Sequence, residues 1–388
     1  MSSENTAITA SEFPLALFSL GLPLTYAAFS LSGFRPPSNL DAMSATVLAV
    51  LGLLLDMLRS GQRSEWPLWL TAGIPALFIG WLSFNSLEPL VRPLQAYIPL
   101  LMEVRPLIFL LVSILWITIF PLPTPEQISF WSGWLSLFIC IEFTCRFFVI
   151  HQPALPNLLG TQGITGPILL AGFCATLHNS EEHWMTRMVI LAGIFCSLGR
   201  DAIFGTVLIL ILFGPKGGLK KVLLTICVLL FTYLSLQVQD MTFINRQDLP
   251  AYWLWFTLLD LLSNNADFAL YTGLHLFNPL PLNVPPSLWT IWHGQEQIWT
   301  GSEIYLFHIQ PFWLHILAAW GLCGLSLFAA VFTYLYKRYP SAMMGGLITA
   351  VSICGFFSPL FFSPATALVL FPAFIAAAAP EVQSFKFE

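Results

Sequence analysis

The chain has 388 residues, of which 57% are hydrophobic and 9% are charged, and its formal net charge is −5. Soluble globular proteins carry about 25% charged residues. This composition, with a mean hydropathy of +0.77, excludes a soluble enzyme, a disordered tail and a disulfide scaffold. The sequence has no cluster of basic residues that could bind the phosphates of a nucleic acid, which excludes nucleic acid as a partner. Most of the chain is therefore expected to lie in membrane lipid.

Twelve apolar segments are long enough, or nearly long enough, to cross a bilayer. Because backbone polar groups in lipid need internal partners, these segments are predicted to be helices. The fold class is therefore an all-α, polytopic integral membrane protein with one transmembrane helical domain, residues 1–388. The predicted spans are 13–31, 42–58, 67–84, 106–120, 129–150, 166–177, 188–198, 203–213, 222–236, 311–336, 342–357 and 366–378.

Segment 87–102 is apolar but is broken by Pro89, Pro93 and Pro99. Proline removes a backbone donor and disrupts a helix interior. This segment is therefore predicted to be a re-entrant or interfacial piece rather than a span.

Basic residues beside short loops set the predicted orientation. Clusters follow the second, eighth and tenth spans, and with twelve spans all three fall on the same side as both termini. Because basic residues favour the cytoplasmic side, both termini are expected in the cytoplasm. The polar, acidic start lacks the positive region of a cleaved signal peptide, so the first span is expected to be retained.

The same count places segment 237–310 on the outer side, as one long late loop. Its part 249–262 is predicted to be a short helix on the membrane surface, because its tryptophans suit the headgroup layer. A Trp-rich stretch at 289–299 mixes aromatic faces with amide and carboxylate groups. That mixture suits a glycan and equally suits an aromatic belt at the membrane surface.

Neither the cysteines nor the histidine-rich loop predicts a metal site. All seven cysteines lie in apolar runs and are predicted to be buried small hydrophobes rather than a disulfide framework. The loop with His178, Glu181, Glu182 and His183 lacks the HExxH spacing, so a solvated loop is favoured over zinc ligation. No metal and no cofactor are predicted.

Six arginines fall away from the cytoplasmic side, against the usual bias: Arg35, Arg92, Arg105, Arg146, Arg200 and Arg246. A charge within a span costs about 2.5–3.5 kcal/mol, and arginine can bind phosphate through two parallel hydrogen bonds. These residues are therefore functional candidates.

Arg200 is the sharpest candidate, because it follows Gly199 at the start of a span. It is interpreted as an anion-binding residue. Its guanidinium and the free N–H groups at the start of the helix would bind the same anion. The alternative is a turn pair with Asp201. For Arg246, a loop arginine paired with Asp248 or Asp240 is favoured on the residue alone, with a second phosphate contact as the alternative.

Arg146 lies four residues after Glu142 and shares its helix face, so an internal ion pair is favoured over a substrate contact. His308 opens the tenth span at a polar–apolar boundary. It is either a general base, a hydrogen-bond donor or, more often for such a histidine, a satisfied cap.

Three local features occur in a suggestive order. Gly199-Arg-Asp-Ala202 begins a span, Arg246 precedes Tyr252-Trp-Leu-Trp255, and His308 precedes Leu317-Ala-Ala-Trp-Gly-Leu-Cys-Gly324. With the span number, the cytoplasmic termini and the late loop, this order resembles the O-antigen polymerase and O-antigen ligase superfamily of bacterial envelopes. Members often have Ser-Arg and His-Asn where this chain has Gly-Arg and His-Ile-Gln.

The resemblance implies a metal-independent glycosyltransferase of the bacterial inner membrane. Its donor is an undecaprenyl-diphosphate-linked oligosaccharide, and its second substrate is a glycan acceptor. Arg200 and Arg246 would hold the diphosphate, while His308, or else Glu303 or Glu296, would take the acceptor proton. The predicted catalytic residues are His308, Arg200 and Arg246, and the predicted substrate-binding residues are Arg146, Trp292, His293, Glu296 and Glu303.

Polymerisation of lipid-linked repeat units on the periplasmic side is the favoured activity, with a chain-length regulator and a flippase as protein partners. Ligase-type transfer of the glycan to lipid A core or protein is the second. A transporter or flippase is the rival from another class, and it would show inverted repeats, which are not evident in the sequence.

Overall fold

The computed structural model describes residues 12–32, 40–58, 98–145, 148, 162–178, 184–214, 226, 229, 249–264, 269–274, 278–283, 285 and 304–379. Within these ranges the protein is helical, and the strand-type pairing there is one isolated antiparallel bridge between Leu280 and Ile304. The predicted all-α fold class is therefore confirmed for the described residues.

Within the described part of the chain, three helices are long and apolar enough to cross a membrane, by length and composition. They are α6 (Ile98–Ile119), α7 (Pro125–Cys145) and α15 (Phe312–Arg338). Other apolar helices are α3 (Leu40–Leu58), α8 (Gln162–Ala175), α9 (Trp184–Cys196), α10 (Arg200–Phe213), α16 (Ala342–Cys354) and α17 (Pro364–Ala377). The count of twelve spans and the side of each terminus stay predictions.

The first predicted span is one unbroken helical run, formed by α1 (Phe13–Ala16), the π-helical turn Leu17–Gly21 and α2 (Leu22–Leu31). Predicted segment 67–84 and nearly all of 222–236 lie outside the described residues. The proline-broken segment differs from its prediction at its end, because α6 already begins at Ile98. Pro99 is the second residue of this helix, where a missing N–H removes no intrahelical hydrogen bond.

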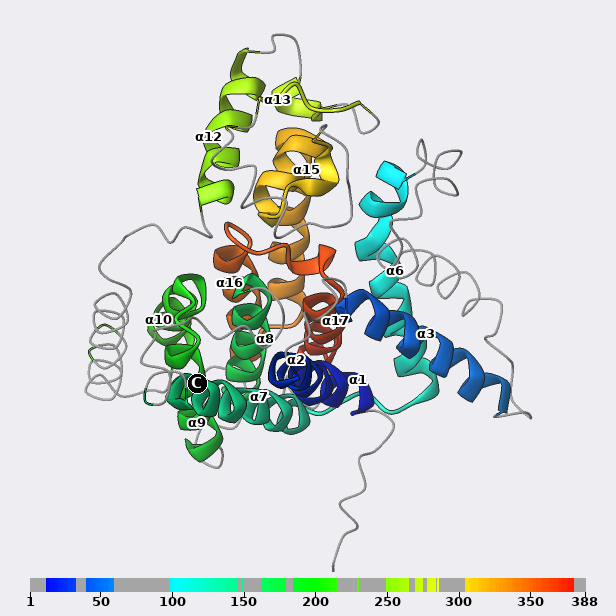
Figure 1. Cartoon of the computed structure of the whole chain (residues 1–388), viewed down its shortest axis with the longest axis vertical. Coiled ribbons are helices and arrows are strands. Elements are labelled where there is room, and N and C mark those ends of the chain that lie inside the picture. Colours follow the sequence, from blue (N-terminus) through cyan, green and yellow to red (C-terminus); the bar gives the residue numbers. More distant parts are fainter. Residues whose placement is uncertain are drawn as a thin grey trace, which may run out of the picture.

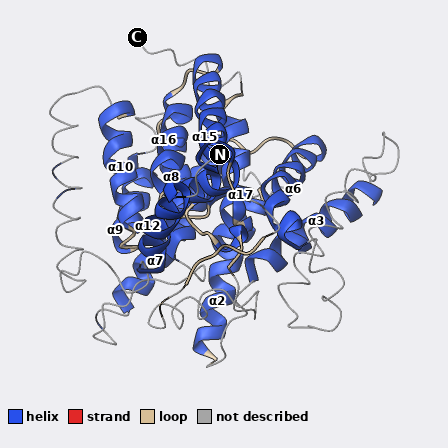
Figure 2. Ribbon diagram, turned by 90° about the horizontal axis from the view of Figure 1, so that it is seen from above, coloured by secondary structure: helices blue, strands red, loops and turns tan. Residues whose placement is uncertain are grey.

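Helix α8 forms the centre of the described bundle. It packs against α7, α9, α10, α16 and α17 (Figures 1 and 2). Every residue from Ile164 to Leu177 is buried. A helix surrounded on all sides is expected to be apolar around its whole circumference, which explains why this short run has no polar face.

Helices α7 and α9 pack along a seam of small residues. A Cβ added to Gly193 would lie 2.7 Å from the Cα of Ser136, so the two backbones nearly touch there. One turn further along each helix, the thiols of Cys140 and Cys196 hydrogen-bond to each other. Small residues allow such close approach between apolar helices.

The cysteines divide into buried and exposed groups. Cys174 and Cys354 are buried as predicted, whereas Cys145 and Cys323 are exposed and Cys140 and Cys196 are partly buried. The prediction of burial is therefore wrong for Cys145 and Cys323, and Cys227 lies outside the described residues. An apolar run alone does not indicate which helix face meets protein and which meets the surroundings.

Helix α15 is broken near its middle. Gly321 has φ 62° and ψ −158°, a backbone conformation outside the helical region. The break frees the carbonyl of Ala318, which accepts a hydrogen bond of 2.7 Å from the N–H of Leu274, two residues after the end of α13 (Ala269–Thr272). Figure 1 shows α13 and α12 (Leu249–Asn264) beside this part of α15. The break is therefore the docking point for α13.

We predict that Gly321→Ala destabilises the protein. A Cβ there would lie 2.7 Å from the backbone nitrogen of Thr272, and the positive φ is unfavourable for any other residue. Strain at such a position costs about 1–3 kcal/mol, so the melting temperature in detergent should fall. Gly133→Ala is the matched control, because its Cβ would meet Thr186 at an ordinary 3.6 Å. Equal melting temperatures for both variants would contradict this packing.

We also predict that mild oxidation joins Cys140 to Cys196. A disulfide needs Cα atoms about 5.5 Å apart, and the α7–α9 seam holds the two thiols in contact. Treatment with copper phenanthroline, followed by mass spectrometry of tryptic peptides, should detect this one link. Cys196→Ser should abolish it, whereas Cys145→Ser, on the exposed end of α7, should leave it intact. A link in the Cys196→Ser variant would show that another cysteine lies closer.

Candidate functional site

The connection between α16 and α17, Gly355–Ser363, holds the ends of several elements. Helix α15 begins without a side-chain cap, and the N–H groups of Phe312 and Trp313 donate instead to the carbonyls of Ser358 and Gly355, each at 3.0 Å. Such N-terminal N–H groups have no partner within their own helix. The connection therefore satisfies the start of α15 with backbone acceptors.

Helix α12 contacts the same connection. The Trp255 indole N–H donates to the carbonyl of Phe356 at 3.1 Å, and the two rings stack with centroids 5.7 Å apart. Leu254 and Leu258 of α12 pack in a small apolar cluster with residues around the start of α15. The predicted helix at 249–262 is confirmed. Its position on the membrane surface stays a prediction.

Helix α10 begins at Arg200, after Gly199 in an extended backbone conformation. The side chain of Asp201 is buried, and its Oδ2 accepts a 3.1 Å hydrogen bond from the Ser358 hydroxyl. The Cys354 thiol hydrogen-bonds the same carboxylate. Arg200 is partly exposed. Asp201 thus ties the start of α10 to the α16–α17 connection and leaves Arg200 at the margin of this junction.

Glycines make room for the Asp201 carboxylate. A Cβ added to Gly199 or to Gly166 would lie 3.2 Å from one of its oxygens. Helix α8 carries Gly166, so three elements meet around this carboxylate. The glycine before Arg200 therefore has a packing reason, in addition to the turn that the sequence indicates.

His308 ends a short 3-10 turn, Leu306–His308, which leads into α15. Its Nδ1 accepts a hydrogen bond of 2.9 Å from the N–H of Tyr305, and its ring packs on Phe307 with centroids 4.2 Å apart. The side chain is 6% exposed. An imidazole whose Nδ1 accepts a hydrogen bond carries its proton on Nε2 when it is neutral. His308 thus caps this turn through Nδ1 and, when neutral, carries its proton on Nε2.

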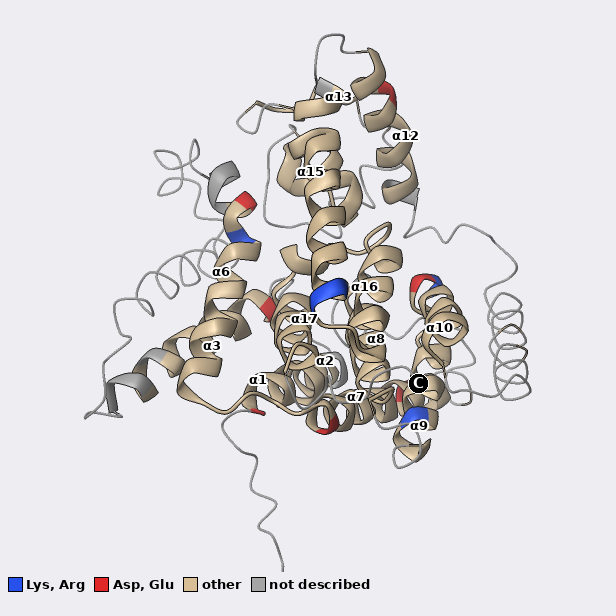
Figure 3. Ribbon diagram, turned by 180° about the vertical axis from the view of Figure 1, so that it is seen from behind, with Lys and Arg blue, Asp and Glu red and all other residues tan. Residues whose placement is uncertain are grey.

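Two of the predicted site residues are described. Arg200 lies on α10, and His308 lies on the 3-10 turn that leads into α15. Both α10 and α15 form hydrogen bonds with the α16–α17 connection. The remaining predicted site residues lie outside the described part of the chain: Arg146, Arg246, Trp292, His293, Glu296 and Glu303. Figure 3 shows adjacent acidic and basic residues at one end of α10 and at one end of α6. The charges on α6 form a second polar cluster.

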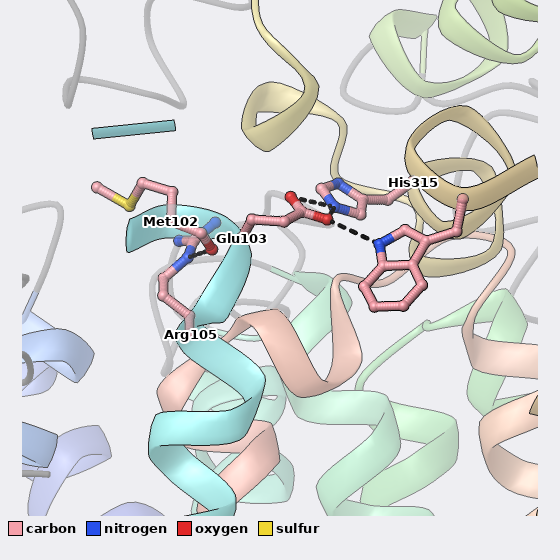
Figure 4. Close-up of polar contacts among 5 residues, drawn as sticks. Met102, Glu103, Arg105 and His315 are labelled. Carbon is pink, nitrogen blue, oxygen red and sulfur yellow. Dashed lines mark hydrogen bonds and ion pairs between the residues drawn. The ribbon is translucent and has the colours of Figure 1, made fainter. Parts of the chain in front are cut away.

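This second cluster joins α6 to α15 and was not singled out from the sequence. His315 Nε2 lies 2.9 Å from both carboxylate oxygens of Glu103, and the Trp320 indole N–H donates to Oε1 at 3.3 Å. Figure 4 shows Glu103 reaching from α6 toward the two aromatic side chains. The side chains of His315 and Glu103 are 1% and 8% exposed. We call Glu103, His315 and Trp320 the Glu103 cluster.

Arg105 lies beside this cluster and interacts electrostatically with Asp41. The Arg105 Nε donates to the carbonyl of Met102 at 2.8 Å, and its guanidinium lies 5.9 Å from the ring centroid of Phe362. Its charge acts on both Glu103 and Asp41. The His315 ring also packs on Phe362, at 4.1 Å. The Glu103 cluster therefore touches the same α16–α17 connection that holds Asp201.

A signal for this cluster exists in the sequence. Glu103 and Arg105 directly precede the predicted span 106–120, and His315 lies within the predicted span 311–336. Ionisable groups within apolar segments are functional candidates by default. The sequence could not pair them, because His315 and Glu103 are 212 residues apart.

An apolar hollow lies elsewhere, among α1, α3, α6 and α17. Its lining includes Leu15, Leu48, Val112, Trp116 and Leu368 and none of the charged residues above. Such a lining offers no grip for a charged headgroup. Within the described ranges, no group of three or more histidine, cysteine, aspartate or glutamate residues is placed to hold a metal ion.

Comparisons with protein-family models, with curated proteins and with solved structures give no match. The function is therefore argued from the residues and their geometry.

We predict that Ser358→Ala weakens the junction. The buried Asp201 carboxylate would lose its hydroxyl donor, and a hydrogen bond to a charged group is worth about 1.5–3 kcal/mol. The melting temperature in detergent should fall measurably. Ser326→Ala is the control, because that hydroxyl is exposed and bonds only within its own helix. A melting temperature for Ser358→Ala equal to that of the control would contradict a structural role for this hydrogen bond.

Proposed function

We propose that this protein is an inner-membrane glycosyltransferase that polymerises undecaprenyl-diphosphate-linked saccharide repeat units on the periplasmic side. One observation supports the proposal above others: Arg200, at the start of α10, and His308, ahead of α15, belong to elements anchored on one short connection. A cation suited to a diphosphate lies at the start of α10, and an imidazole suited to a sugar lies just ahead of α15; both helices bond to the same short connection.

Arg200 is the proposed contact to the donor diphosphate. Its partly exposed side chain lies at the N-terminus of α10, and the dipole of a helix N-terminus favours an anion. The neighbouring Asp201 carboxylate is turned into the protein and bound by Ser358. In the proposed transfer, the acceptor hydroxyl forms a bond to C1 as the bond from C1 to the phosphate oxygen breaks. A guanidinium beside the departing diphosphate stabilises the charge that develops there.

His308 is proposed to orient a sugar hydroxyl through Nε2–H. This differs from its sequence-based interpretation as a base, because Nδ1 already accepts the Tyr305 N–H. Arg246 stays a predicted second diphosphate contact outside the described residues.

A flippase for the same lipid-linked glycan is the second candidate. Transporter sites form at interrupted membrane helices, and α15 is interrupted at Gly321, directly after Trp320 of the Glu103 cluster. Ligase-type transfer would use the same diphosphate contacts and differ in the acceptor.

The deciding experiment uses the purified full chain in lipid nanodiscs with a synthetic lipid-diphosphate oligosaccharide. The proposal expects elongated lipid-linked product, detected by gel and mass spectrometry. Transfer only to an added lipid A core acceptor would replace polymerase by ligase. Movement of the substrate across a proteoliposome membrane without any new glycosidic bond would favour the flippase and contradict the proposed glycosyl transfer.

We predict that Arg200→Ala lowers the rate of elongation about a hundredfold and Arg200→Lys about tenfold. A hydrogen bond to a charged group is worth about 1.5–3 kcal/mol, which corresponds to about 10–150-fold in rate, and lysine retains the charge but loses the bidentate grip. Arg338→Ala is the matched control, since Arg338 is an exposed arginine in the last turn of α15. A wild-type rate for Arg200→Lys would remove the bidentate contact from the proposal.

A further inference from the structure

We infer that the buried Glu103–His315 pair is the acid–base element of the proposed transfer, with His315 Nδ1 accepting the proton of the attacking hydroxyl and Glu103 positioning the ring. The inference rests on the proposed function and names the group that removes the proton. It starts from the geometry of the two histidines that lie near the beginning of α15.

The geometry of His308 makes it a poor proton acceptor. Its Nδ1 accepts the N–H of Tyr305 at 2.9 Å, so the lone pair of that nitrogen is already used. In the neutral ring the other nitrogen carries the proton and has no lone pair to offer. A second proton on Nδ1 would face the Tyr305 N–H directly and repel it. His308 therefore suits hydrogen-bond donation.

His315 has the opposite arrangement. Its Nε2 lies 2.9 Å from both carboxylate oxygens of Glu103, so the ring proton is held on Nε2 and donated to the carboxylate. Nδ1 is then the nitrogen with a lone pair. A carboxylate that receives one imidazole N–H fixes the tautomer and stabilises the imidazolium that forms when the other nitrogen accepts a proton.

Charged groups lie near the Glu103–His315 pair. Arg105 acts electrostatically on Glu103 and on Asp41, which in turn acts on Tyr26, and the Trp320 indole N–H donates a hydrogen bond to Glu103. A proton accepted by His315 would face the Glu103 carboxylate, which compensates the charge of the imidazolium in apolar surroundings.

The Glu103–His315 pair is buried, but it contacts a side chain that reaches the surface. His315 is 1% exposed, whereas Trp320, which donates to Glu103, is 50% exposed. The His315 ring packs on Phe362 of the α16–α17 connection, and Ser358 of the same connection bonds Asp201 beside Arg200. The proton acceptor and the proposed diphosphate contact are thus tied to one nine-residue segment.

The proposed step balances without any additional reagent. The hydroxyl O–H bond breaks, its oxygen forms the new bond to C1, and the bond from C1 to the phosphate oxygen breaks with its electron pair leaving on the lipid diphosphate. The proton moves to His315 Nδ1, either directly or through one water molecule. It then passes to the departing diphosphate or to water, which restores the neutral ring.

A purely structural ion pair is the alternative, and a double substitution separates the two. Replacing both partners of a buried pair by apolar residues is often neutral or stabilising for the fold. We therefore expect the Glu103→Met, His315→Leu double variant to remain folded, by melting temperature and by size-exclusion elution, while elongation falls at least about a hundredfold. A folded double variant with the wild-type elongation rate would overturn the inference.

Single variants can be compared by their pH–rate profiles, which a purely structural role of the pair would not change. His315→Gln should lose the acidic limb of the pH–rate profile. Glu103→Gln should lower the rate as well, because the carboxylate no longer fixes the tautomer of the ring. His308→Gln is the comparison, and it should lower the rate while the acidic limb stays in place. Loss of the limb in His308→Gln and its retention in His315→Gln would assign the proton to His308 instead.

The two proposals fail in different ways. If the wild-type protein elongates the lipid-linked glycan but the His315 variants do so equally well, only the Glu103–His315 assignment fails. If the wild-type protein forms no glycosidic bond, the proposed function fails, and the assignment that rests on it fails too.

Discussion

The backbone of the α16–α17 connection is the constraint on which the arrangement of the candidate site depends. Apolar surroundings leave a helix end few ways to satisfy its N–H groups, and α15 begins after Pro311 without a side-chain cap. The carbonyls of Ser358 and Gly355 supply the acceptors. With its hydroxyl bound to Asp201, Ser358 joins the starts of α10 and α15. A change in the conformation of this segment would therefore displace both helix starts together.

Charged groups inside the described helices have two different kinds of partner. Arg187 of α9 is buried, and its guanidinium donates to the carbonyl of Thr176 at 2.6 Å and to the Thr176 hydroxyl at 3.2 Å. It thereby caps the end of α8, where helix carbonyls lack partners. Glu103 and His315 cap no helix end. They bind each other between two helices, beside a half-exposed tryptophan, which is the setting expected of a group that exchanges protons.

The sequence predicts the helices of this protein well and its polar contacts poorly. Apolar runs locate α7 and α15 to within a few residues, because the length and composition of a run determine whether it forms a helix in lipid. The break at Gly321 escapes prediction, because a glycine in an apolar run is equally typical of close helix packing. Its conformation is determined by α13, which docks there through Leu274. The Glu103 cluster escapes for a related reason, since its partners come from distant segments.

The two histidines show why the choice of a base needs atomic geometry. His308 and His315 are seven residues apart, and composition and polarity favour His308 because it stands at the edge of a span. What separates them is the partner of each ring nitrogen. A backbone N–H occupies the Nδ1 of His308, whereas a carboxylate receives the Nε2–H of His315. The first arrangement opposes a positive ring and the second stabilises one. In the proposed reaction, the same residue type would therefore have two roles, as a donor that orients sugar and as a base that removes a proton.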